Sequence, residues 1–181
     1  MNTLELEHLK FPIGPFSPLK TITSEDLENY ISTLERFPSN LKTLVSELTT
    51  EQLNYNYRPN GWNIKQVVHH CADSHTNCLI RFKLTLTEEN VTIKPYMEDR
   101  WANLIDGTDD TIIYSLKIIE GTHYRLTKLL RSLNEEQRAL TYIHPEYNKQ
   151  VRLDEAIANY AWHCNHHYAH IVQALNRNTN F

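Results

Sequence analysis

The sequence predicts an all-α protein, a four-helix bundle with long crossover loops, formed by residues 1–181 as a single domain. Apolar side chains recur every three or four positions over four long stretches, which is the pattern of helices that bury one face. Only 4 of the 181 residues are glycine, and so few suit helices better than a turn-rich sheet protein. The segments between the four stretches are lengthy, which indicates crossovers rather than tight turns.

The first helix is expected to follow a non-helical lead-in. Residues 1–22 hold three of the seven prolines and should be extended. Thr23-Ser24 can then cap a helix whose first turn carries acidic residues. Pro38 lies inside this helix, and we expect it to kink or split the helix.

The second helix should run from about Asn63, its capping residue, to about Thr87. Residues 88–108 contain a proline and a glycine and are expected to form a long loop with one helical turn around 98–104. The third helix is then predicted over residues 109–133, where apolar residues again recur at helical spacing.

Two short capped turns are predicted, at residues 49–53 and 134–140, and each follows a long helix. Residues 141–152 are rich in β-forming side chains and predict a hairpin or an extended loop. The fourth helix should span residues 153–176 and complete the bundle.

Composition excludes several classes of protein. The net charge of -4 and the absence of any Lys/Arg run argue against a nucleic-acid partner. No apolar stretch approaches the roughly 20 residues that cross a bilayer, and the N-terminus lacks the order of a signal peptide, so we expect no membrane association and a cytoplasmic location. The three cysteines, Cys71, Cys78 and Cys164, are too irregularly spaced for a disulfide framework or a thiolate zinc site and should pack as small apolar residues.

Histidine is abundant: seven of the ten histidines fall in two short runs, one on the second helix and one on the fourth. On the second helix, His70 lies about 100° from the apolar stripe that contains Cys71. His75 borders that stripe, so we expect a structural core histidine whose loss lowers stability and leaves metal binding intact. His69 points away from the stripe and should be exposed.

The fourth helix offers two pairs of histidines at H-x-x-x-H spacing, His163/His167 and His166/His170. Either pair places two imidazoles one turn apart, so that both can reach one ion. His163 and His167 border the apolar stripe on the flank that matches His70, whereas His166 and His170 lean outward. We therefore favour His70, His163 and His167 as three metal ligands and expect His166 to be exposed.

The other histidines have weaker claims to a role in the site. His170 is equally well interpreted as a residue that supports a ligand and as a partly exposed bystander. Three further histidines are isolated in the sequence and predict no site: His8, His123 and His144.

Neutral imidazole suits borderline divalent metals such as zinc, nickel, iron and copper. Three protein ligands leave coordination positions open, which is the catalytic rather than the structural pattern. Asp73, one turn from His70, could orient that ligand or could be a solvated carboxylate. Arg81 could receive an anionic group of a substrate, although an ordinary salt bridge is slightly preferred. Three aromatic residues could wall the pocket or belong to the core: Trp62, Tyr96 and Trp101.

Several motifs together resemble one known family. They include His69-His70-Cys71-Ala72-Asp73, Ile93-Lys94-Pro95-Tyr96 and the run from Tyr160 to Ile171. In combination these motifs look like the DinB-like superfamily, above all its YfiT branch of metal-dependent hydrolases, over nearly the whole chain. The resemblance implies a four-helix bundle, a three-histidine site for zinc or nickel and a homodimer. His70 matches the family's first ligand, and His163, His167 and Ile171 match its helix-four motif.

These features predict an enzyme with one divalent ion per chain, zinc before nickel, and a small-molecule substrate. The leading hypothesis is a hydrolase in which the metal activates water. A close alternative, implied by bacillithiol-transferase relatives, is an S-transferase for a low-molecular-weight thiol. A third alternative is a metal-binding stress-response module without catalysis. The sequence contains no substrate-recognition motif that decides among them.

Overall fold

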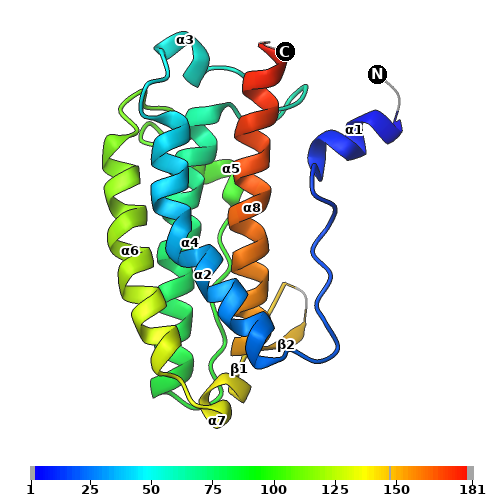
Figure 1. Cartoon of the computed structure of the whole chain (residues 1–181), viewed down its shortest axis with the longest axis vertical. Helices are drawn as coiled ribbons and strands as arrows, with labels where there is room; N and C mark the ends of the chain where they lie inside the picture. The colour runs from blue at the N-terminus through cyan, green and yellow to red at the C-terminus, as the bar shows by residue number, and fades with distance from the viewer. Residues whose placement is uncertain (1–2, 147, 179–181) are drawn as a thin grey trace.

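Four long helices pack side by side in the computed structural model, which describes residues 3–146 and 148–178 (Figure 1). They are α2 (Ser24–Val45), α4 (Ile64–Thr87), α6 (Ile113–Ser132) and α8 (Leu153–Arg177). Helix α2 packs against α6 and α8, and α4 packs against the same two helices. The predicted four-helix bundle is therefore confirmed, with α2 and α4 diagonally opposite each other.

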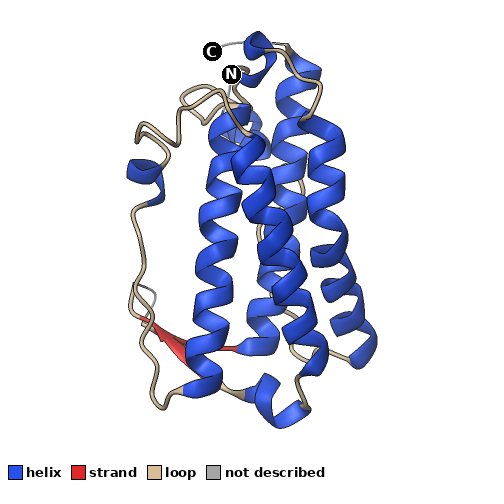
Figure 2. Cartoon of the chain, turned by 90° about the vertical axis from the view of Figure 1, so that its left-hand side faces the viewer, coloured by secondary structure: helices blue, strands red, loops and turns tan. Residues whose placement is uncertain are grey.

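Shorter elements complete the described part of the chain. Four short helices are α1 (Thr3–Lys10), α3 (Thr50–Leu53), α5 (Glu98–Trp101) and α7 (Glu135–Ala139). The predicted hairpin is confirmed as β1 (Thr141–His144) and β2 (Lys149–Arg152), which pair antiparallel with Tyr142 opposite Val151. This hairpin lies at one end of the bundle (Figure 2).

Local capping explains where several helices begin. Thr23 and Asn63 are the N-caps of α2 and α4, as predicted, and each forms a capping box with the residue three positions on. Thr49 and Asn134 cap the two short helices in the same way. Each box satisfies amide groups that the first helical turn leaves without partners.

One prediction about the N-terminal part of the chain was wrong. Residues 1–22 were expected to be non-helical, yet residues 3–10 form α1, because the prolines begin only after it. The last residues of α1 are held by α8, where Gln173 donates to the Leu9 carbonyl and His170 to the Lys10 carbonyl.

Pro38 does not split α2, which runs unbroken from Ser24 to Val45. Proline lacks an amide hydrogen, so Pro38 leaves the carbonyl four residues earlier, on Leu34, without its helical partner. His123 of α6 occupies that place, with its Nδ1 2.6 Å from the Leu34 oxygen. A tertiary hydrogen bond therefore replaces the one that proline removes.

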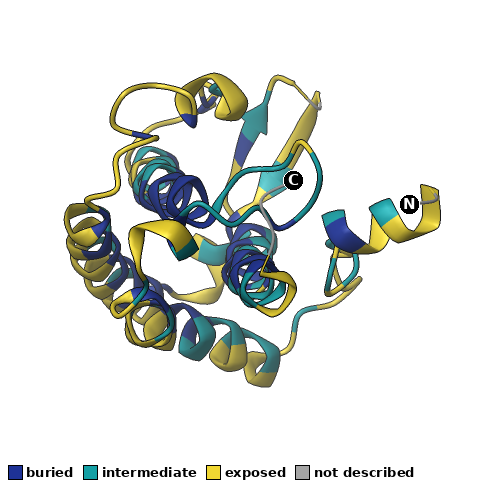
Figure 3. Cartoon of the chain, turned by 90° about the horizontal axis from the view of Figure 1, so that it is seen from above, coloured by how far each residue is buried: buried dark blue, intermediate teal, exposed yellow. Residues whose placement is uncertain are grey.

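The buried faces of the four long helices meet along the bundle axis (Figure 3). Large apolar side chains such as Leu34, Phe82 and Ile157 are almost fully enclosed there. The three cysteines are buried with free thiols, as predicted for small apolar residues. Within the described residues, no helix combines the length and apolarity needed to cross a membrane.

Candidate metal centre

Helices α4 and α8 bring three imidazoles together: His70 from α4, and His163 and His167 from α8. One ring nitrogen of each lies within 4.8 Å of the other two. The Nε2 atoms of His70 and His163 are 3.2 Å apart. His163 and His167 are one helical turn apart, so their rings lean toward the same point, with centroids separated by 4.3 Å.

This donor set fits a divalent ion. Two nitrogens that share a tetrahedral zinc ion lie about 3.3 Å apart, close to the separation seen between His70 and His163. Burial lowers the pKa of His70 to about 4 and lowers the pKa of His163 and His167 well below the ordinary value. The three rings are therefore neutral near pH 7, which is the form that binds metals.

The outer nitrogen of His167 faces another histidine. His170 Nε2 lies 3.0 Å from the Lys10 carbonyl, which can only accept, so Nε2 carries the proton of His170. His170 Nδ1 must then accept, and it lies 3.4 Å from His167 Nδ1. This arrangement places the proton of His167 on Nδ1 and leaves its Nε2 free for a metal. His170 is thus buried and in contact with His167, and is not a partly exposed bystander.

An aromatic side chain covers one side of the three imidazoles. Trp62 lies with its ring centroid 4.7 Å from that of His70 and 6.5 Å from that of His167. His163 keeps partial exposure, whereas His70 and His167 are buried. Tyr96 and Trp101 instead pack against each other at 4.5 Å, and within the described residues neither ring contacts the three histidines.

The structure does not bring Asp73 or Arg81 into hydrogen-bond contact with the described atoms of the three histidines. Asp73 lines a surface groove between α4 and α6 with Ile80 and Lys117, and burial raises its pKa. Arg81 donates to the Tyr160 hydroxyl at 3.2 Å, while its buried Nε has no partner. No ion pair to Arg81 is seen among the described residues, so the slightly preferred salt bridge has no observed partner there.

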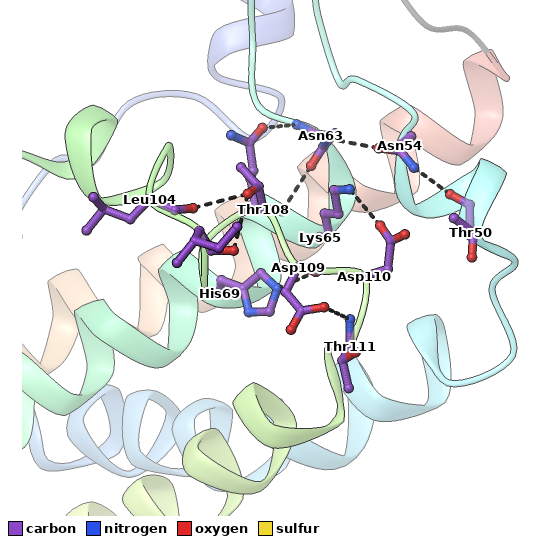
Figure 4. A network of polar contacts seen from close by, with 12 residues as sticks. Thr50, Asn54, Asn63, Lys65, His69, Leu104, Thr108, Asp109, Asp110 and Thr111 are labelled. Atoms are coloured by element: carbon purple, nitrogen blue, oxygen red, sulfur yellow. Dashed lines mark hydrogen bonds and ion pairs between the residues drawn. The ribbon is translucent and has the colours of Figure 1, made fainter.

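His69 was expected to be exposed but is only 8% exposed. The segment that leads into α6 covers this face of α4 (Figure 4). His69 Nε2 donates to the Asp109 carbonyl at 2.8 Å, and the Ser115 hydroxyl donates to Nδ1 at 2.7 Å. Both nitrogens are used structurally, so His69 is not available to a metal.

His166 was also expected at the surface, yet it is 7% exposed. Its ring stacks on Trp162 at 4.3 Å and meets Phe11 at 5.9 Å. The N-terminal segment causes this burial, since the Trp162 indole donates to the Gly14 carbonyl and draws that segment over α8.

One histidine was overlooked. His123 was interpreted as isolated, but it is 1% exposed and lies 4.6 Å from His75, centroid to centroid. Its position in the apolar pattern of α6, between Ile119 and Leu126, was a signal of burial. His75 is fully buried as predicted, and its Nε2 lies 3.1 Å from His163 Nδ1.

Comparisons with known proteins agree with this architecture. The profile of the DinB superfamily matches residues 33–171. A Bacillus subtilis protein named "Putative metal-dependent hydrolase YfiT" is 41% identical over 170 residues, covering 94% of this chain and 96% of that protein. A Bacillus cereus protein named "Putative metal-dependent hydrolase" is 43% identical over 172 residues, covering 95% of this chain and 98% of that protein.

A solved structure is similar over its whole length as well. It is described as "YfiT from Bacillus subtilis is a probable metal-dependent hydrolase with an unusual four-helix bundle topology". The TM-score is 0.91 at 41% identity, covering 94% of this chain and 97% of that one.

Proposed function

The chain belongs to the DinB superfamily, and from that premise we propose that it is a metal-dependent hydrolase that binds one divalent ion through His70, His163 and His167. The convergence of three imidazole nitrogens within 4.8 Å carries the proposal. The names of the relatives support metal dependence and hydrolysis. We expect zinc first and nickel second, because neutral imidazoles suit both.

The chain's own residues hold and shield the site. A divalent ion bound only by neutral ligands keeps its full charge and supplies activation of a water molecule at neutral pH. Trp62 excludes solvent from the side of His70 and His167, and the partial exposure of His163 leaves an approach for a small substrate.

One observation favours a second candidate, transfer of a low-molecular-weight thiol. Among the described residues, the side-chain hydrogen bonds of the three imidazoles go to other histidines, and none goes to a carboxylate that could serve as a general base. A thiolate is a strong nucleophile once it is deprotonated, and it needs no base at the moment of attack. The non-catalytic metal-binding module is the third possible outcome.

The test begins with metal content. Protein purified without nickel resin should contain close to one zinc or nickel ion per chain by elemental analysis. The matched variants are His163→Ala and His8→Ala. His163→Ala should lose the ion, whereas His8→Ala removes an exposed histidine outside the proposed ligand set and should keep it.

Activity is then measured on metal-loaded and chelated protein side by side. Ester and amide hydrolysis that stops on chelation supports the hydrolase. Turnover of an electrophile that requires an added thiol supports the transferase. Full metal occupancy with no turnover on either panel would refute both enzymes and leave the binding module.

A further inference from the structure

Three histidines from three different helices, the partly exposed His163 and the buried His75 and His123, form a series of contacts that ends on the fourth helix. His163 of α8 meets His75 of α4, and His75 stacks on His123 of α6. His123 reaches the Leu34 carbonyl of α2. Apart from His163, none of these side chains belongs to the proposed ligand set.

This series of histidine contacts ends at the Leu34 carbonyl, which Pro38 leaves without a helical hydrogen bond. Because Pro38 has no amide hydrogen, the Leu34 carbonyl is free to accept, and His123 Nδ1 lies 2.6 Å from it. A carbonyl oxygen cannot donate, so Nδ1 of His123 carries the proton. His123 Nε2 is then unprotonated and can only accept a hydrogen bond, and it is buried without a described partner.

His75 lies in the middle of this series of contacts with no freedom to turn. It is 0% exposed and lies between two rings, Phe37 at 5.6 Å and His123 at 4.6 Å, both nearly parallel to it. Its Nε2 is 3.1 Å from His163 Nδ1, and its Nδ1 has no described partner. The ring plane of His75 is therefore set by packing, and its one polar contact is with His163.

A second metal ion is the competing interpretation of this region. One ligand atom each of His75, His123 and Cys164 lies within 4.8 Å of the other two. A metal on His75 Nδ1 would leave the His75 proton on Nε2, where it would donate to His163 Nδ1. His163 would then carry its own proton on Nε2, the atom that faces His70. With neutral rings, the two metal sites exclude each other.

We propose that His75 is a positioning residue that accepts the Nδ1 proton of His163 and so keeps His163 Nε2 free to bind the metal. This inference rests on the proposed three-histidine site. His123 and Phe37 hold the ring of His75 in place, and the Leu34 carbonyl anchors His123. Histidine ligands in proteins are commonly fixed through their second nitrogen, and loss of that partner weakens metal binding.

The experiment compares two polar variants of nearly equal bulk. His75→Gln places a carbonyl oxygen near the position of Nε2 and can still accept from His163. His75→Asn is one carbon shorter and cannot reach it. Leu126→Ala, a fully buried change on α6, controls for a general loss of packing. Zinc affinity is measured by competition with a chelator on protein shown to be folded.

The sequence alone predicts that loss of His75 leaves metal binding intact, and the contact of His75 with His163 revises that expectation. We expect His75→Asn to weaken zinc binding by about 10- to 100-fold, and His75→Gln and Leu126→Ala to stay close to the wild-type affinity. The absorption spectrum of the cobalt-substituted protein should change in His75→Asn alone. Equal affinity in all four proteins would overturn the inference. If the wild-type chain binds two ions and both His75 variants lose one of them, His75, His123 and Cys164 form a second metal site instead.

A measurement without metal separates this inference from the proposed function. Nitrogen-15 chemical shifts distinguish a protonated imidazole nitrogen from a lone pair, and in metal-free protein they should place the His163 proton on Nδ1. His75→Asn should move that proton toward Nε2. If wild-type protein binds no metal, the metal site is refuted while these shifts still decide the role of His75. A His163 proton on Nε2 in wild-type protein would refute the positioning role.

Discussion

Two pairs of histidines on α8 share the same spacing but have different surroundings. His163 and His167 face α4, where His70 Nε2 lies 3.2 Å from His163 Nε2. His166 and His170 face the N-terminal segment and the loop before α4, where His166 meets Phe11 at 5.9 Å and His170 stacks on Tyr57 at 3.8 Å. The comparison teaches that an H-x-x-x-H pair marks a helix face. The element that packs against that face decides whether the pair forms part of a candidate metal site or only packs against aromatic side chains.

The largest expected effect separates the two pairs directly. Alanine at His70, His163 or His167 should weaken zinc binding by more than about 100-fold, because each change would remove one of the three proposed ligands. His166→Ala should leave the affinity unchanged, since its ring contacts aromatic side chains. Chelator competition on folded protein measures both. Loss of binding in His166→Ala with retention in His163→Ala would reverse the assignment of the pairs.

Acid should destabilise the metal-free protein strongly. Burial lowers the pKa of His70, His123 and His166 to about 4, below the unfolded value of 6.5. The folded state therefore binds fewer protons than the unfolded state, so stability is full above pH 6.5 and falls as the pH drops toward 4. His123 alone should account for about 3 kcal/mol of that loss.

Urea unfolding across this pH range measures the effect, with and without zinc. Zinc should protect the protein down to a lower pH, because protonation of His70 must then compete with metal binding. His166→Phe should flatten the metal-free profile and leave the protection by zinc intact. A metal-free stability that does not change between pH 6.5 and 4 would contradict the buried neutral histidines.

His170 should show an intermediate effect, since it belongs to the outer pair yet contacts the inner one. His170→Phe keeps a ring against Tyr57 but removes the acceptor for His167 Nδ1. We expect zinc affinity to fall by about tenfold, less than for loss of a ligand. An affinity loss as large as that of His167→Ala would make His170 a ligand itself.

The smallest effect on zinc affinity is expected at Phe11, which packs against His166 of the His166/His170 pair. Phe11→Ala removes a ring that lies 5.9 Å from His166 and is itself partly exposed. The pKa of His166 should rise toward its ordinary value as water gains access, while zinc affinity stays unchanged. Nuclear magnetic resonance titration of the His166 ring checks this. An unchanged pKa would mean that Trp162 alone shields it.

Much of the fold could be predicted because its signals are local. The caps at Thr23 and Asn63, the hairpin over 141–152 and the four apolar stripes depend on neighbouring residues, and the structure confirms them. The helical period also indicated that His70, His163 and His167 share an orientation, and the structure brings them together. Their binding of a metal stays a prediction.

Contacts between segments that are distant in the sequence could not be predicted from such local patterns. A helical wheel gives the direction of His69 and His166 but not the segment that covers them, and both were wrongly expected at the surface. Pro38 signalled a lost hydrogen bond, yet nothing near it in the sequence points to His123, 85 residues away.

The sequence by itself determined which residues form the helices and which flank of each helix carries histidines, because both follow from the 3.6-residue period and from local capping. Only the tertiary structure decided that the N-terminal segment buries His166, that His170 contacts His167, and that His75 and His123 link His163 to α2. The physical reason is that ring proton positions depend on hydrogen-bond partners. In this protein those partners come from other helices and from carbonyl groups far away along the chain.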